Sequence, residues 1–199
     1  MKKESFFSER IKPVIVMAVL TIVCITLVSG IHLSTVELVI ANEGLVLKKA
    51  VLYAGGIDIP ENNLEINDLY DERVSEKQDI FVINGEDGSP SSYAFISAGP
   101  GLWGEIEAVM AFNTDLETFT GVDFIKQNET PGLGARITEE WFKQQLRGKN
   151  PPLTLAAEGE SEGPNEIDAI TGATRTSNYV LQLFNDAGAR AAELEKEGL

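Results

Sequence analysis

The residues best suited to chemistry lie in the C-terminal third, where segment 168–174 reads DAITGAT and ends on Thr174. Gly172 and Ala173 precede this threonine, and such small residues let a bulky group approach the backbone. A helix is expected to begin just after it, and the free N–H groups of a helix start favour a phosphate. The segment therefore suits a threonine that carries a phosphoester, and a plain capping turn is the alternative.

Composition excludes several other kinds of site. Cys24 is the single cysteine and lies in an apolar N-terminal stretch, so disulfides and cysteine metal sites are excluded. His32 is the single histidine and is expected to be structural, and no metal site is predicted. The chain has 16 Lys and Arg against 31 Asp and Glu, a formal net charge of -15 that repels nucleic acid.

An N-terminal membrane anchor is predicted, because no charged residue occurs between Lys12 and Glu37 and this run can cross a hydrocarbon core as a helix. The cations before it predict a cytoplasmic N-terminus and an exported domain. They are Lys2, Lys3, Arg10 and Lys12. The alternative is a cleaved signal peptide, since Val28-Ser29-Gly30 resembles a cleavage site.

The middle of the chain predicts a domain of the α+β class. Helices are expected at 34–53, ended by Gly55-Gly56, and at 65–74. Short runs rich in Ile, Val, Phe and Tyr predict antiparallel strands joined by hairpins. These runs are 79–84, 93–98, 105–113 and 119–126. Strands in the middle and helices at the flanks are typical of an antiparallel sheet flanked by helices.

Two more helices are expected towards the C-terminus. One begins at Thr138 and ends by Gly148, and the acids Glu139 and Glu140 suit its first turn better than they suit catalysis. An acidic loop at 158–165 and a strand at 166–170 follow. Thr176 or Ser177 then caps a final helix with an apolar stripe, formed by Val180, Leu181, Phe184, Ala187 and Leu194.

Segment 168–174 resembles the flavinylation motif of FMN-binding subunits of the NqrC and RnfG type. Those subunits belong to the sodium-pumping NADH:quinone reductase and to the related Rnf complex. ETPGLG at 129–134 and GLW at 101–103 resemble further motifs of this family, in the same order. The resemblance extends over roughly residues 99–184.

The resemblance implies that Thr174 binds FMN covalently through its phosphate, attached by a flavin transferase that takes it from FAD. It also implies that the 129–134 loop lies beside the flavin, with Thr130 and Leu133 as contacts. No catalytic residue is expected. The residues expected at the cofactor are Leu102, Trp103, Glu129, Thr130, Gly132, Leu133, Gly134, Asp168, Thr171, Gly172, Ala173 and Thr174.

Some of these residues have a structural alternative. Gly132 and Gly134 could serve only tight turns. Trp103 is as consistent with a core position as with a flavin neighbour. Asp168 could orient the threonine loop, assist the transferase or act as a cap.

The resemblance implies an electron-transfer subunit in the bacterial inner membrane, with a periplasmic FMN-binding domain. Its partners would be other subunits of an Nqr or Rnf complex, which couples NADH:quinone or ferredoxin:NAD oxidoreduction to Na+ or H+ translocation. Alternatives are a freestanding extracytoplasmic flavoprotein and a cofactor-free anchored binding domain. Three regions are expected. Residues 1–33 form the cytoplasmic N-terminus and the membrane anchor, residues 34–78 form a helical connector and the start of the outer domain, and residues 79–199 form the FMN-binding domain.

Overall fold

The computed structural model describes the backbone of residues 3–197 and the side chains of residues 11–197. The chain divides into two compact units, Met1–Gly44 and Leu45–Leu199. Residues 45–78 therefore belong to the same unit as the sheet. The finer division at residues 33 and 78 stays a prediction.

Helix α1 runs without interruption over Lys3–Ala54, so the anchor and the helix expected at 34–53 are one element. The hydroxyls of Ser34 and Thr35 donate to carbonyls four residues earlier, which keeps these polar groups paired inside the helix. Within the described residues, α1 is the one helix long and apolar enough to cross a membrane. It ends before Gly55 and Gly56 as predicted, and Gly56 adopts a left-handed φ of 81°.

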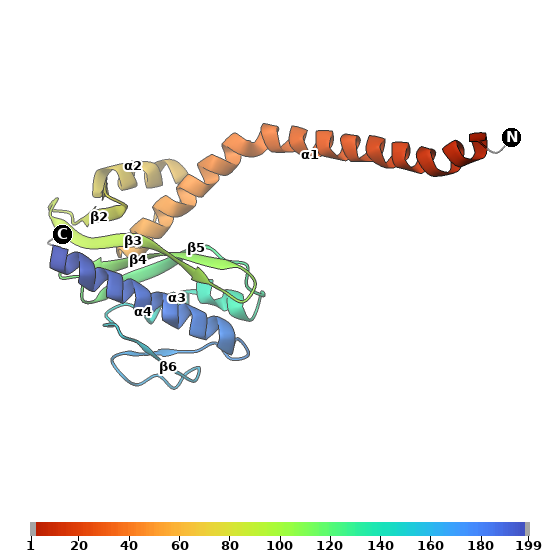
Figure 1. Ribbon diagram of the computed structural model, residues 1–199. Coiled ribbons are helices and arrows are strands. Elements are labelled where there is room, and N and C mark those ends of the chain that lie inside the picture. The colour runs from red at the N-terminus through yellow and green to blue at the C-terminus, as the bar shows by residue number, and fades with distance from the viewer. Residues whose placement is uncertain (1–2, 198–199) are drawn as a thin grey trace. The chain divides into compact units, whose positions relative to one another are not determined.

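A five-stranded antiparallel sheet forms the centre of the second unit, with the order β1-β2-β3-β4-β5 (Figure 1). The α+β class and the hairpin order predicted from the sequence are confirmed. The strands are β1 (Val74–Lys77), β2 (Ile80–Asn84), β3 (Pro90–Pro100), β4 (Glu105–Asn113) and β5 (Phe119–Lys126). The sequence did not predict β1, which is a short edge strand with three exposed residues.

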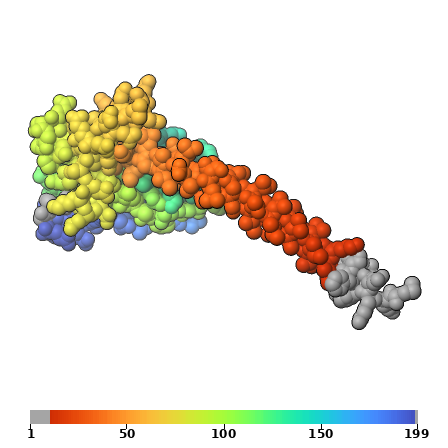
Figure 2. Space-filling view, turned by 90° about the horizontal axis from the view of Figure 1, so that it is seen from above, coloured from red at the N-terminus to blue at the C-terminus, as the bar shows by residue number. Residues whose placement is uncertain are grey.

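Both faces of the sheet are covered. The end of α1 and helix α2 (Asn63–Arg73) pack on one face, where Val51 and Ala54 meet Ile83 and Val109. Figure 2 shows α2 in yellow beside the orange end of α1. On the other face, α4 (Thr174–Glu197) packs against β3 and β4, with Phe184 in the main core. Burial on both faces explains why β4 reads as a nearly continuous apolar run.

The segment after the sheet differs from the expected single helix. It forms a 3-10 helix, η1 (Gly134–Thr138), and a short helix, α3 (Glu140–Gln144). Thr138 is not an N-cap, because its hydroxyl donates to the carbonyl of Ala135 at 2.9 Å inside η1. The Glu139 and Glu140 carboxylates accept hydrogen bonds from neighbouring side chains, which agrees with their predicted structural role.

The C-terminal elements are also shifted from their predicted bounds. The strand expected at 166–170 is β7 (Glu166–Asp168), which pairs in parallel with the unpredicted β6 (Thr154–Ala156). Helix α4 begins at Thr174, so Thr176 and Ser177 lie in its first turn and are not caps. Their hydroxyls donate inward, to Glu129 and to the carbonyl of Ala173.

Candidate functional site

A pocket of about 240 Å³ lies where three distant segments of the chain meet. One lining residue comes from the GLW segment and four come from the ETPGLG loop. The others come from the loop between β7 and α4, called the motif loop, and from the first turn of α4. The lining residues are Leu102, Glu129, Thr130, Leu133, Gly134, Gly172, Ala173, Thr174, Arg175 and Thr176. The volume is below the roughly 300 to 1,000 Å³ of typical ligand sites. A bulky ligand would therefore be enclosed only in part.

Thr174 lies at the edge of this pocket as the first residue of the 24-residue helix α4, and its side chain is exposed. Gly172, two residues earlier, adopts a left-handed φ of 79°, which glycine tolerates at little cost. Ala173 between them is buried. The turn thus presents the Thr174 hydroxyl to solvent beside the unpaired N–H groups of a helix start.

Glu129 joins the three segments through its carboxylate, although the side chain is only 5% exposed. One oxygen accepts the backbone N–H groups of Leu102 at 2.7 Å and Trp103 at 3.2 Å. The other accepts the hydroxyl of Thr176 at 2.5 Å. Glu129 therefore lines the pocket and also holds its walls together.

Two glycines make room for this carboxylate. A Cβ at Gly101 would lie 2.6 Å from Glu129 Oε1, and a Cβ at Gly134 would lie 2.6 Å from both Glu129 Oε2 and Thr176 Oγ1. Real Cβ atoms do not come so close to other heavy atoms. Gly134 thus serves close packing rather than a left-handed turn, whereas Gly132 has a φ of 72° and does serve a turn.

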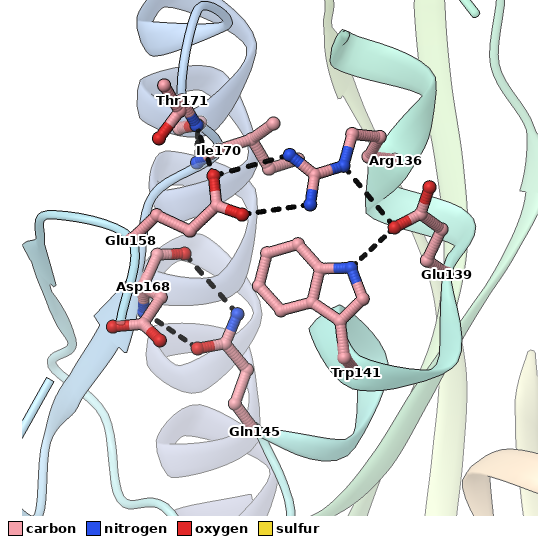
Figure 3. A network of polar contacts seen from close by, with 9 residues as sticks. Arg136, Glu139, Trp141, Gln145, Glu158, Asp168, Ile170 and Thr171 are labelled. Atoms are coloured by element: carbon pink, nitrogen blue, oxygen red, sulfur yellow. Dashed lines mark hydrogen bonds and ion pairs between the residues drawn. The ribbon is translucent and has the colours of Figure 1, made fainter. Parts of the chain in front are cut away.

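A second carboxylate, Glu158, holds the motif loop from the opposite end (Figure 3). It accepts the backbone N–H of Thr171 at 2.7 Å. It also forms a two-pronged ion pair with Arg136, at 2.8 and 3.2 Å. The Arg136 guanidinium, with help from Thr171, lowers the pKa of Glu158 to about 2. Glu158 is therefore ionised at neutral pH.

Asp168 anchors the acidic loop and does not reach the motif threonines. Its carboxylate accepts the N–H of Ser161 at 2.8 Å, and its backbone pairs with the Gln145 side chain (Figure 3). Burial alone would raise the pKa of Asp168, but hydrogen bonds from the 159–161 backbone outweigh it and lower that pKa. The Asp168 side chain acts on the turn at 171–174 only indirectly, because the acidic loop that it anchors begins at Glu158, which bonds Thr171.

The structure brings most of the predicted site residues together. Eight of them line the pocket, and Trp103, Gly132, Asp168 and Thr171 lie outside its lining. Trp103 is 67% exposed, so the core alternative for this residue is wrong. Leu102 and Leu133, at 39% and 43% exposed, form an apolar rim.

The sequence interpretation missed three residues that matter here. Glu158 was assigned to an acidic loop, Thr176 to a cap, and Arg136 to no role. The Arg136–Glu158 and Thr176–Glu129 contacts join residues 22 and 47 positions apart along the chain, and the Glu158–Thr171 contact joins residues 13 positions apart. No local spacing rule marks such contacts, so no signal in a single sequence would have identified them.

These residues fit a flavin phosphate on Thr174. The hydroxyl is exposed at a helix start, Gly172 leaves the approach open, and Leu102 and Leu133 offer apolar surface for a ring. Fold and site together define a domain with an exposed threonine hydroxyl at a helix start beside a shallow, partly apolar pocket. Residues 101–189 match the model of the FMN-binding domain family.

The curated relatives are subunits of two kinds of Na(+)-translocating oxidoreductase. The chain is 31% identical to the NqrC-type member of the Na(+)-translocating NADH-quinone reductase of Yersinia pestis, over 54% of this chain and 43% of that protein. It is 39% identical to the RnfG-type member of the Na(+)-translocating ferredoxin:NAD(+) oxidoreductase complex of Acetobacterium woodii, over 45% and 44%. The chain thus matches less than half the length of these relatives.

Solved structures share the fold. The NqrC-type protein of the Na(+)-translocating NADH-quinone reductase from Parabacteroides distasonis superposes with a TM-score of 0.65 at 25% identity, covering 75% of this chain and 92% of that one. NqrC of Shewanella oneidensis gives a TM-score of 0.62 at 19% identity, covering 74% and 96%. The second likeness concerns the fold alone.

Proposed function

We propose that Thr174 carries FMN as a phosphoester. The observation that supports this most strongly is the position of Thr174, exposed at the first position of α4 beside the pocket of the FMN-binding domain. An exposed hydroxyl in this position is open to a modifying enzyme. When bound, FMN would supply the redox chemistry, and the protein would supply the tether and the orientation.

In the proposed attachment reaction, FAD is the donor of FMN and a flavin transferase is the catalyst. The Thr174 hydroxyl oxygen forms a bond to the phosphorus of the FMN half, the pyrophosphate bond of FAD breaks, and AMP leaves. The hydroxyl proton is released. Threonine is a weak nucleophile at its ordinary pKa, so a base on the transferase is expected to take this proton.

We propose further that the protein relays electrons inside an ion-translocating membrane complex. The names of the relatives support this role, since both are subunits of Na(+)-translocating oxidoreductases. Helix α1 supports a single membrane anchor. The cations before the apolar run support a cytoplasmic N-terminus and a domain on the other side of the membrane.

Covalent attachment is tested by expressing the full chain in its native host, or with a flavin transferase, and measuring in-gel fluorescence and intact mass after denaturation. The wild-type band is expected to fluoresce and to carry the mass of FMN less water. Thr174→Ala is expected to insert and fold but to lose both signals. Thr138→Ala, which removes an exposed threonine outside the pocket, is the matched control and keeps them.

A full signal in Thr174→Ala would overturn the assignment. A wild-type band without flavin, from cells that modify other targets of the transferase, would favour a cofactor-free anchored binding domain. The complex is tested by mild detergent extraction and co-purification. Recovery of multi-span subunits with the flavin-bearing chain is expected, and a chain that keeps its flavin but purifies alone would point to a freestanding carrier.

A further inference from the structure

We propose that two carboxylates, Glu158 and Glu129, are positioning residues that hold the threonines on either side of Thr174. Glu158 holds Thr171, three residues before the modified position, and Glu129 holds Thr176, two residues after it. This inference rests on the proposed attachment of FMN at Thr174. It assigns to Glu158 and Arg136 a role in presenting that residue for modification.

The Glu158 contact fixes the start of the motif turn. Thr171 is exposed, and its backbone N–H donates to Glu158 Oε2 at 2.7 Å. Glu158 lies in the loop after β6 and is itself held by both terminal nitrogens of Arg136 in η1. Arg136 also donates to Glu139 at 3.3 Å and stacks over Trp141 at 5.1 Å from the ring centre. The orientation of the guanidinium is therefore set from several sides.

The Glu129 contact fixes the end of the turn. The Thr176 hydroxyl donates to Glu129 at 2.5 Å, while the other carboxylate oxygen holds the backbone of Leu102 and Trp103. The first turn of α4 is thereby tied to the pocket wall opposite it. Thr174 itself stays exposed, so the two contacts restrain the chain around the hydroxyl without covering it.

The two contacts differ in surroundings, which makes them separable by experiment. Glu129 is buried against neutral donors, whereas Glu158 is half-exposed and paired with a cation. Raised salt weakens partly exposed ion pairs more than buried hydrogen bonds. Glu158 is tested first, because its side chain is partly exposed and its substitution removes no core contact.

The first test measures hydrogen exchange in the full chain in detergent, expressed without a transferase. Glu158→Ala is expected to speed exchange of the Thr171 amide by about tenfold or more, since a hydrogen bond to a charged group is lost. Glu158→Gln keeps an oxygen acceptor and is expected to restore part of the protection. Glu160→Ala, which removes an exposed carboxylate of the same loop, is the control and leaves exchange unchanged.

The second test follows the initial rate of FMN attachment by intact mass, with FAD and a purified transferase. Glu158→Ala is expected to lower this rate by about three- to tenfold while the protein still folds and unfolds in one cooperative thermal transition, and Glu158→Gln to recover part of the rate. Glu129→Gln, which keeps an acceptor oxygen, is the matched variant of the second contact and is expected to lower the rate less than Glu129→Ala.

The outcomes separate the two proposals. Unchanged Thr171 exchange in Glu158→Ala overturns the inference, and so does faster exchange with an unchanged rate of attachment. Absence of FMN on Thr174 in the wild type overturns the proposed function. The exchange measurement on the flavin-free chain still decides whether Glu158 holds the loop, because it needs no cofactor.

Discussion

The hydroxyl of Thr176 donates a 2.5 Å hydrogen bond to the buried carboxylate of Glu129, 47 residues earlier in the chain. The same carboxylate accepts two backbone N–H groups of the GLW segment. One side chain therefore joins the three segments that form the pocket. Removing it should loosen the site more than removing any one of the donors.

Glu129→Ala is expected to lower the free energy of unfolding by about 2 kcal/mol or more, because it leaves a buried hydroxyl and two N–H groups without their acceptor. Glu129→Gln should cost less, since its amide oxygen can still accept from the backbone. Thermal unfolding of the full chain in detergent, followed by circular dichroism, measures both. Equal stability of Glu129→Ala and the wild type would contradict the structural role.

Gly134→Ala is expected to destabilise the protein by about 1 to 3 kcal/mol, because its new methyl group would lie 2.6 Å from Glu129 Oε2 and Thr176 Oγ1. The matched control is Gly44→Ala, whose methyl group meets nothing within 4 Å. That change should be neutral or slightly stabilising in a helix. The same unfolding measurement separates the two, and a neutral Gly134→Ala would refute the close packing.

Gly172→Ala places an L side chain at a left-handed φ of 79°, which costs roughly 1 kcal/mol. Its Cβ would also approach Leu133 Cδ2 to 3.1 Å. Gly159→Ala is the control for backbone strain alone, because its φ is 83° and nothing lies within 4 Å of the added carbon. We expect a larger loss of melting temperature at Gly172, and equal losses would rule out an added contribution from Leu133.

The Glu158 contact should resist acid. The pKa of this carboxyl is lowered from 4.5 to about 2, so its contribution to stability is full above pH 4.5 and is lost as the pH falls through about 2. The NMR shift of the Thr171 amide should therefore stay near its neutral-pH value at pH 4 and move only at lower pH. A transition centred near pH 4.5 would show that Arg136 does not pair with Glu158 in solution.

Trp103 should behave as a surface residue, because 67% of it is exposed. In a Trp141→Phe background, its fluorescence maximum is expected to match that of tryptophan in water. Trp103→Ala should change the free energy of unfolding by no more than about 0.5 kcal/mol. A blue-shifted maximum in the flavin-free chain would contradict the exposed position.

The predicted antiparallel strands follow from patterns within the chain. Runs of Ile, Val, Phe and Tyr between turn residues identify β2 to β5, because strands buried on one or both faces need such residues. Prediction was weakest where burial gives no pattern, as in β1, with three exposed residues, and β6, a strand of three residues. The prediction divided α1 into an anchor and a following helix where the composition changes from apolar to amphipathic. The structure has one helix, because that change does not interrupt helical hydrogen bonds.

The amino-acid sequence by itself determined the charge-free span and the α+β class, because these depend on residue type and short spacing, and the resemblance of segment 168–174 to the flavinylation motif directed attention to Thr174. Tertiary structure alone decided that Glu129 bonds Thr176, that Glu158 bonds Thr171 and Arg136, and that Trp103 lies in solvent. Such contacts depend on sheet register and on the packing of α4. A contact between side chains tens of residues apart produces no local periodicity in the amino-acid sequence.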